Sequence, residues 1–252
     1  MDFYRQPKDL TYLLLQVRKK DDPMRDHEVE CFAQALRCPI GNIATHDLIS
    51  SHPAQTQIDR VDAVLIGGSG DFSVARGGPW LPQAMRTFQD LHNISKPTFA
   101  SCWGFQAFAR ALGGEVITDI GRAELGTLEM NLTAAGLQDP LFSPLGNTFF
   151  GQLGHEDIVL RLPPGAVLLA SSKKVENQAF TFAGKPIYCT QFHPEMAAAD
   201  LIQRLQAYPQ YLEKITGWTI DEFREHCHET PDTVLLLSRF SDFLCSISTP
   251  GK

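Results

Sequence analysis

The 252-residue sequence predicts an α/β protein built around a mostly parallel central sheet. Short apolar runs at 12–17, 63–66 and 97–100 have the continuous hydrophobicity of strands that are buried on both faces. Amphipathic segments of helical length alternate with these runs along the chain, at 26–36, 82–91 and 105–112. Strands that alternate with helices form βαβ units, in which the strands run parallel.

The pattern changes between 115 and 182 to short strands separated by closely spaced turn residues. These turns are expected at Gly136, Pro140, Pro163-Pro164-Gly165 and Gly184-Lys185-Pro186. Their spacing predicts a small antiparallel or mixed addition beside the main sheet. One further apolar strand is expected at 187–189, because Ile187-Tyr188-Cys189 follows the last turn.

Four amphipathic helices are expected after Met196, at 199–207, 209–215, 220–227 and 233–244. We therefore divide the chain into a main domain, residues 1–196, and a C-terminal helical extension, residues 197–252, packed on it. The extension is longer than closure of the sheet requires. Packing on the core, formation of a homodimer and docking of a separate enzyme are three roles that the sequence leaves open for it.

The composition favours a cytoplasmic protein without nucleic-acid or membrane partners. The formal net charge is −7, and the clearest cationic cluster, Arg18-Lys19-Lys20, precedes Asp21-Asp22 and is expected to be a solvated loop. No segment has the length and apolarity of a membrane span or a signal peptide. The six cysteines include no Cys-x-x-Cys pair, so neither a disulfide framework nor a zinc ribbon is expected.

We expect no metal and no cofactor. The segment His226-Cys227-His228 carries metal-ligating residue types, but adjacent residues on a helix point in different directions and no spaced ligand pair accompanies them.

The segment from Phe99 to Gln106 contains a candidate nucleophile, Cys102. An apolar strand enters a tight turn, which the small residue Gly104 allows to close, and the chain continues as a helix. This is the pattern of a nucleophile elbow. Such a turn lifts the side chain clear of the sheet, and the start of the helix favours a thiolate, the form of cysteine that attacks carbonyl groups.

A base for this cysteine follows the strand at 187–189, in Gln191-Phe192-His193-Pro194-Glu195. His193 can carry a proton, and Glu195 can hold the imidazole. Open parallel sheets gather their chemistry at the carboxyl ends of their strands, where both the cysteine and the histidine are expected. A Gly-rich loop, residues 67–73, follows a third strand, and its backbone N–H groups could bind an anion. It lacks the Lys-Ser or Lys-Thr of a P-loop, so an oxyanion hole fits it better.

These motifs resemble those of class I glutamine amidotransferases, the Cys-His-Glu family that includes the glutaminase part of GMP synthase. The resemblance covers about residues 10–196 and depends on Gly67-Gly68, Cys102-x-Gly104-x-Gln106 and His193-Pro194-Glu195. It implies a flavodoxin-like three-layer sandwich.

The resemblance also implies roles for particular residues. Cys102 would attack the side-chain amide of glutamine and form a thioester, and His193 would carry the proton. Glu195 would hydrogen-bond the imidazole. The backbone N–H groups of Gly68 and Trp103 would form the oxyanion hole.

A second set of residues would bind the substrate by the same resemblance, namely Gln106, Gly67, Gly154, His155 and Glu156. The family commonly has Gly and His where this chain has Ala100 and Phe105, and many members have Ser-His-Gly in place of Gly154-His155-Glu156. The substrate is therefore less firmly defined than the chemistry.

Three functions remain open at this stage. The first is a glutaminase that passes ammonia to a separate synthetase. The second is a stand-alone γ-glutamyl peptidase or hydrolase, because the same thioester chemistry cleaves any γ-glutamyl amide whose amine fits. The third is a non-catalytic binding or regulatory protein, which an intact Cys102, His193 and Glu195 disfavours.

Overall fold

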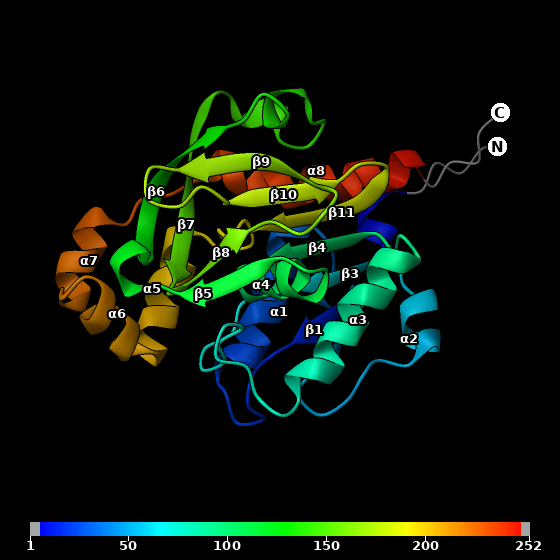
Figure 1. Ribbon diagram of the computed structural model, residues 1–252, viewed down its shortest axis with the longest axis horizontal. Helices are drawn as coiled ribbons and strands as arrows, with labels where there is room; N and C mark the ends of the chain where they lie inside the picture. Colours follow the sequence, from blue (N-terminus) through cyan, green and yellow to red (C-terminus); the bar gives the residue numbers. More distant parts are fainter. Residues whose placement is uncertain (1–5, 248–252) are drawn as a thin grey trace.

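Five parallel strands form one half of a nine-stranded central sheet, in a computed structural model that describes residues 6–247 (Figure 1). The strand order in this half is β2-β1-β3-β4-β11, the doubly wound order of flavodoxin-like sheets. The bounds are β1 Tyr12–Gln16, β2 Ile43–Asp47, β3 Ala63–Ile66, β4 Thr98–Ser101 and β11 Lys185–Thr190. The predicted α/β, flavodoxin-like fold is confirmed.

Helices cover both faces of the parallel half and make it a three-layer sandwich (Figure 1). Side chains alternate along β1, so that Tyr12 and Leu14 belong to one core and Leu13 and Leu15 to the other. The first core is closed by α1 Met24–Leu36 and α8 Pro231–Ile247. The second is closed by α2 Gln55–Asp59, α3 Leu81–Asn93 and α4 Trp103–Ala111.

Antiparallel strands extend the same sheet beyond β11. They are β10 Ala179–Phe182, β9 Ala166–Ser172, β6 Glu124–Leu132 and β7 Thr148–His155. A separate two-stranded sheet pairs β5 Glu115–Thr118 with β8 Asp157–Arg161. The predicted addition is antiparallel as expected, but it is not small, because it supplies four of the nine strands of the main sheet.

The C-terminal segment contains α5 Ala198–Ala207, α6 Pro209–Ile215 and α7 Ile220–His226 ahead of α8. The first three helices surround a third apolar cluster that includes Leu125, Leu201, Leu205 and Phe223. Short 3-10 helices lie at Pro7–Asp9, Ile40–Asn42, Ile120–Arg122, Gly136–Gln138 and Ser143–Leu145. Within residues 6–247, no helix combines the length and the apolar character that a membrane crossing needs.

Outside the region 115–182, one strand and one α-helix were not predicted, β2 and α2. β2 is an edge strand whose sequence, Ile-Ala-Thr-His-Asp, is half polar and mostly accessible, so it lacks the apolar run that marks the inner strands. α2 spans only one turn and buries a single residue, Ile58. The other predicted elements match the structure to within about three residues at each end.

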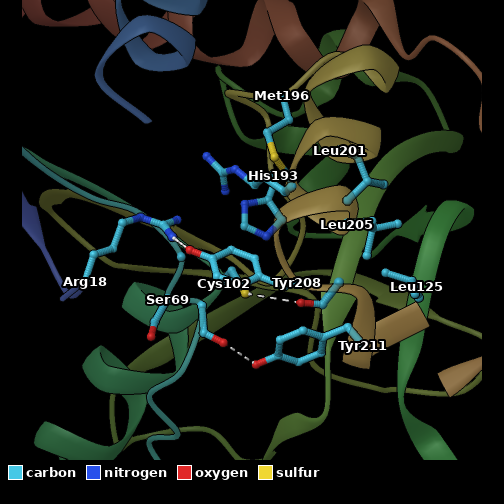
Figure 2. Close-up of a pocket in the computed structure, with 14 residues that line it drawn as sticks. Arg18, Ser69, Cys102, Leu125, His193, Met196, Leu201, Leu205, Tyr208 and Tyr211 are labelled. Atoms are coloured by element: carbon cyan, nitrogen blue, oxygen red, sulfur yellow. Dashed lines mark hydrogen bonds between the residues drawn. The ribbon is translucent and has the colours of Figure 1, made fainter. Parts of the chain in front are cut away.

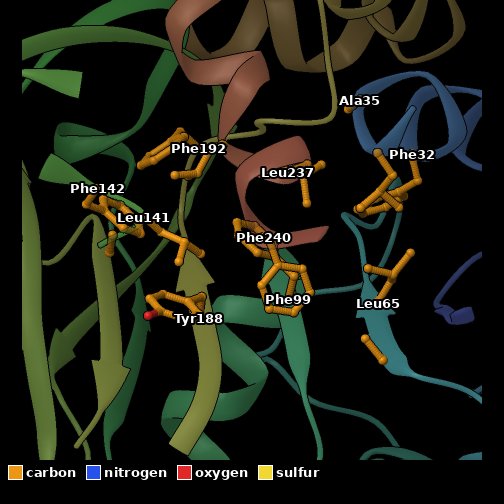
Figure 3. Packing of buried hydrophobic residues seen from close by; sticks show 14 of the residues in the cluster. Phe32, Ala35, Leu65, Phe99, Leu141, Phe142, Tyr188, Phe192, Leu237 and Phe240 are labelled. Atoms are coloured by element: carbon orange, nitrogen blue, oxygen red, sulfur yellow. The ribbon is translucent and has the colours of Figure 1, made fainter. Parts of the chain in front are cut away.

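Helix α8 completes the core beneath the strand that leads to Cys102. The ring of Phe240 is fully buried and meets Phe99 of β4 edge to face, with ring centroids 5.5 Å apart (Figure 3). It also lies 6.2 Å from the ring of Tyr188 on β11. The last described helix therefore packs against both strands that carry the candidate catalytic residues.

We expect Phe240→Ala to lower the free energy of unfolding by about 3–5 kcal/mol, because it removes a fully buried ring and leaves a cavity. Urea denaturation followed by circular dichroism measures this loss. Phe150→Ala is the matched control, because Phe150 is 51% exposed and its loss should cost less than about 1 kcal/mol. Equal effects of the two substitutions would contradict the assigned role of α8.

Candidate active site

The carboxyl ends of four neighbouring parallel strands meet at one edge of the sheet. Arg18 follows β1, the loop 67–70 follows β3, Cys102 follows β4 and His193 follows β11. Because β11 pairs with β4 in parallel register, the cysteine and the histidine leave the sheet side by side. Both line one pocket, which Figure 2 shows from close by.

Cys102 stands in a strained turn between β4 and α4. Its φ of 50° lies in the left-handed region, which costs a non-glycine residue on the order of 1–3 kcal/mol. Its N–H donates to the carbonyl of Thr190 at 2.7 Å, which ties the turn to the end of β11. A Cβ atom on Gly104 would lie 2.7 Å from Cγ2 of Ile66, so glycine is needed where α4 approaches β3. Ala100, in contrast, is an ordinary buried residue of β4 and carries no positive φ.

His193 and Glu195 form a buried ion pair beside this turn. The imidazole Nδ1 and the carboxylate Oε1 are 2.6 Å apart, and the two residues are 4% and 3% exposed. Burial alone would lower the pKa of His193, but the charge of Glu195 and the neighbouring Cys102 side chain raise it to about 9. Burial would likewise raise the pKa of Glu195, and the imidazolium holds that pKa below its usual range.

Arg204 of α5 lies next to this pair and was not predicted. Its Nη1 is 3.9 Å from Oε1 of Glu195, and the residue is only 7% exposed. Its Nε and Nη2 atoms have no hydrogen-bond partner among the described residues. The sequence could not indicate this residue, because it lies on the amphipathic helix α5, after the last recognisable motif, His193-Pro194-Glu195.

The two proposed oxyanion donors lie on either side of the cysteine. Trp103 is the first residue of α4, so its N–H has no acceptor one turn earlier in the helix. A Cβ atom on Gly68 would lie 2.9 Å from Cε1 of His193 and 3.8 Å from Cβ of Cys102. Only glycine fits between the histidine and the cysteine without displacing the imidazole.

Two tyrosines of the C-terminal segment hold the Gly-rich loop. Tyr211 donates a hydrogen bond to the carbonyl of Gly70 at 2.7 Å. The ring of Tyr208 lies so close to Gly70 that a Cβ atom there would come within 2.4 Å of it. The hydroxyl of Tyr208 donates to the carboxylate of Asp22 at 2.6 Å and accepts from Nη1 of Arg18 at 3.0 Å. Residues far apart in the sequence therefore fix one loop.

The expectation of a solvated loop at Arg18-Lys19-Lys20 is wrong for its first residue. The Arg18 side chain is 1% exposed, and its guanidinium pairs with Glu28 at 3.2 Å and Asp22 at 3.5 Å. Lys19, by contrast, is exposed and pairs with Asp71 at the surface. Arg18 is buried because Glu28 of α1 and Tyr208, which follows α5, enclose its guanidinium, and charge patterning along the sequence cannot show such contacts.

Cys102 lies between two pockets, which share it with Ser69, Gly154 and Tyr211. We name the first the Arg204 pocket; it is also lined by His193 and by side chains of the C-terminal helices. We name the second the Gln106 pocket; it is also lined by Trp103, Gln106, His155, Glu156 and Asp157. The thiol donates weakly to the carbonyl of Gly154, 3.8 Å away.

The residues predicted to bind substrate lie at the Gln106 pocket, with one exception. Gln106, Gly154, His155 and Glu156 all line it. Gly67 lines neither pocket. A Cβ atom there would lie 2.2 Å from Oε1 of Glu28, so this glycine is required by close packing on α1.

Several of these side chains are engaged with other protein groups. Nε2 of Gln106 donates to the carbonyl of Asp157 at 2.9 Å. His155 contacts that same carbonyl at 3.1 Å through Nδ1, and Glu124 at 3.1 Å through Nε2. Glu156 pairs with Lys214 of α6 at 2.5 Å. Asp157 was not predicted; its carboxylate accepts from Ser73 and the Ala75 amide and so fixes the end of the Gly-rich loop.

One group of described residues has donor atoms close enough for a metal ion, His27, Cys31 and Asp200, all within 4.8 Å of one another. These donors already have partners. Asp200 accepts from the Ala197 amide at 2.8 Å and from His27 at 3.2 Å, and burial raises the pKa of the Cys31 thiol. The group therefore packs α1 against α5, and we assign no metal to it.

The fold and this edge of the sheet define a class of protein, a doubly wound α/β chain with a cysteine at a strand-to-helix turn next to a histidine–carboxylate pair. Residues 37–203 match the family model described as glutamine amidotransferase class-I. The chain belongs to the class I glutamine amidotransferase family, as its motifs suggested.

Relatives of known name support this assignment. The chain is 25% identical over 206 residues to GMP synthase of Petrotoga mobilis, a match that covers 81% of this chain and 39% of that one. It is 33% identical over 127 residues to a protein of Methanocaldococcus jannaschii named as one subunit of GMP synthase, covering 50% of this chain and 65% of the relative. The chain thus spans less than two thirds of the length of these curated relatives.

Solved structures show the same fold. A glutamine amidotransferase from Thermotoga maritima superposes with a TM-score of 0.73 at 19% identity, covering 94% of this chain and 98% of that one. A protein from Thermoplasma acidophilum, named as a putative GMP synthase subunit, gives a TM-score of 0.61 at 19% identity, with 94% of each chain covered.

We expect Glu195→Gln to lower the pKa of His193 from about 9, because burial is then opposed only by the neighbouring Cys102 side chain. His193 should therefore be mostly charged at pH 7.5 in the wild type, and the charged fraction at that pH should be smaller in the variant. A titration of ¹⁵N-labelled histidine by NMR measures this change.

Glu124→Gln provides the matched control, because it removes the carboxylate of the other buried histidine–carboxylate pair, that of His155. It should leave the titration of His193 unchanged. A His193 pKa that stays near 9 in Glu195→Gln would show that the carboxylate does not hold the imidazolium.

Proposed function

We propose that the protein hydrolyses the side-chain amide of glutamine through a thioester on Cys102, releasing ammonia and glutamate. One observation carries this proposal. In a chain of the class I glutamine amidotransferase family, a cysteine at a strained strand-to-helix turn shares a pocket with His193, whose Nδ1 lies 2.6 Å from Oε1 of the buried Glu195.

In the first half of the reaction, the Sγ thiolate of Cys102 attacks the side-chain carbonyl carbon, and the carbonyl oxygen becomes an oxyanion. The C–N bond then breaks, and His193 gives its proton to the departing nitrogen. The raised pKa of His193 suits this role, because the imidazole holds a proton before attack. Glu195 keeps Nδ1 occupied and so directs Nε2 to the reacting groups.

In the second half, water attacks the thioester while His193 accepts its proton, a second oxyanion forms and collapses, and the C–S bond breaks. The products are glutamate and the regenerated thiolate. The N–H groups of Gly68 and Trp103 are our candidates for binding both oxyanions, because they flank the cysteine.

We propose further that residues 1–196 carry the chemistry and that the helices after residue 196 shape the site. Matched relatives include proteins named as one subunit of GMP synthase. Such a name implies that those enzymes have at least one further subunit. A separate enzyme that takes up the ammonia is therefore one candidate partner for this chain.

A second candidate function is hydrolysis of γ-glutamyl peptides without a partner. It is favoured by the Arg204 pocket, whose walls include Leu201, Arg204, Leu205 and Tyr208 of the same chain. A glutaminase that only releases ammonia needs little space beside the cysteine, whereas an amine larger than ammonia needs a pocket of this kind.

We expect Cys102→Ala and His193→Ala each to abolish turnover, and Glu195→Ala to retain a measurable fraction of it, because orientation of the base is less critical than attack and proton transfer. Release of ammonia and amines is measured on glutamine, asparagine, γ-glutamyl dipeptides and glutathione. Unchanged activity of Cys102→Ala would refute the mechanism. Cys102-dependent release from γ-glutamyl peptides without release from glutamine would favour the second candidate function.

We expect Tyr211→Phe to lower kcat about 2- to 10-fold with little change in KM. The substitution keeps the ring but removes the hydrogen bond that holds the carbonyl of Gly70, and the loop it holds acts on the oxyanion. Steady-state kinetics on glutamine measures both constants. Tyr188→Phe is the matched control, because it removes a hydroxyl bonded to Asp139 that lines neither pocket. An equal loss of kcat in both variants would contradict the role of the Gly70 contact.

A further inference from the structure

We propose that the Arg204 pocket binds the leaving amine of a γ-glutamyl substrate and that Arg204 binds a carboxylate on that amine. The inferred substrates are γ-glutamyl dipeptides with an apolar C-terminal residue and a free C-terminal carboxylate. This inference rests on the thioester chemistry proposed above and names the substrate class of the same site.

The position of His193 decides which pocket takes which half of the substrate. An amide attacked by Cys102 extends in two directions from the thiol, with the γ-glutamyl group on one side and the amine on the other. His193 lines the Arg204 pocket and does not line the Gln106 pocket. Because the histidine must protonate the departing nitrogen, the amine lies on the Arg204 side.

The charge of Arg204 predicts an anionic group on that amine. The residue is 7% exposed, and its Nε and Nη2 atoms have no hydrogen-bond partner among residues 6–247. Its nearest carboxylate oxygen, Oε1 of Glu195, is 3.9 Å from Nη1, beyond hydrogen-bond distance, and is bonded to His193 at 2.6 Å. A buried guanidinium with unused donors is stabilised by an acceptor, and a carboxylate matches its planar geometry.

Arg18 lines the same pocket but cannot serve in this way. Its Nη2 pairs with Glu28 at 3.2 Å, and its Nη1 contacts Asp22 and the hydroxyl of Tyr208. The charge of Arg18 is thus neutralised within the protein, and Arg204 supplies the positive charge that faces a ligand.

The remaining walls predict an apolar part on the same amine. Leu125, Met196, Leu201 and Leu205 line the pocket, and each is at least 92% buried. A carboxylate next to an aliphatic side chain is the pattern of an apolar amino acid. Ammonia alone would use neither the guanidinium nor these side chains.

The reaction balances without any further reactant. The thiolate forms the C–S bond, the C–N bond breaks, and the proton of His193 goes to the nitrogen, which releases a neutral amine that takes up a further proton from water. Water then hydrolyses the thioester, giving glutamate and an amino acid as products.

The test compares γ-glutamyl-leucine with γ-glutamyl-leucinamide, which differ only in the C-terminal carboxylate. We expect wild-type kcat/KM to be at least about tenfold higher for the acid, and this preference to fall to about twofold or less in Arg204→Gln. Arg204→Lys should restore part of it. Arg224→Gln, on the exposed face of α7, is the matched control and should keep the wild-type preference.

The ratio of kcat/KM for the acid to kcat/KM for the amide distinguishes carboxylate binding by Arg204 from an effect of Arg204 on Glu195. If Arg204 only positioned Glu195, Arg204→Gln would slow both substrates equally and leave the ratio unchanged, which would overturn the inference. A wild-type ratio near one would also overturn it.

A binding measurement keeps the test independent of how Arg204→Gln folds. Calorimetry on Cys102→Ala, which cannot turn over, should give a dissociation constant at least about tenfold lower for the acid than for the amide. Equal affinities would overturn the inference while leaving the thioester mechanism intact. Failure of the mechanism itself shows separately, as hydrolysis of glutamine and both peptides that does not depend on Cys102.

Discussion

The buried pair of His193 and Glu195 is the interaction on which the site depends. A carboxylate and an imidazolium removed from water are each costly unless something compensates the charge, and here each compensates the other across 2.6 Å. Two further features lie beside the pair, a glycine at position 68 that leaves room for the imidazole and the guanidinium of Arg204, 3.9 Å from the carboxylate.

The C-terminal helices belong to the active site as much as to the core. Tyr208 and Tyr211 hold the Gly-rich loop that follows β3, and Arg204 and the leucines of α5 form the wall of one pocket. α8 covers one face of the same strands, beside α1, and packs its aromatic side chains against them. The C-terminal helices thus line one pocket beside Cys102 and also cover one face of the sheet.

Most of the fold, and the nearness of Cys102, His193 and Glu195 at the candidate site, could be predicted from the sequence, because both have local signals. Buried parallel strands are continuous apolar runs, and the turn at Cys102 and the His193-Pro194-Glu195 segment are each contiguous in the chain. What could not be predicted depends on contacts between distant residues. Arg18 looked like part of a solvated cationic loop until Glu28 and Tyr208 enclosed it, and Gly67 looked like a substrate residue although Glu28 fills the space beside it. Arg204 lies on a helix whose pattern reports only which face is apolar.

The packing of α8 also has a consequence for how the chain folds. The hydroxyls of Tyr12 and Ser241 lie 2.9 Å apart although 229 positions separate them in the sequence, and Phe240 covers Phe99 in the centre of the sheet. Contacts of such long range form late, since the loop between them must close first. During synthesis, the part of this face that α8 covers therefore stays uncovered until residues 231–247 have left the ribosome. In that interval the apolar side chains that α8 later covers on β4 and β11 are a target for chaperones and for aggregation.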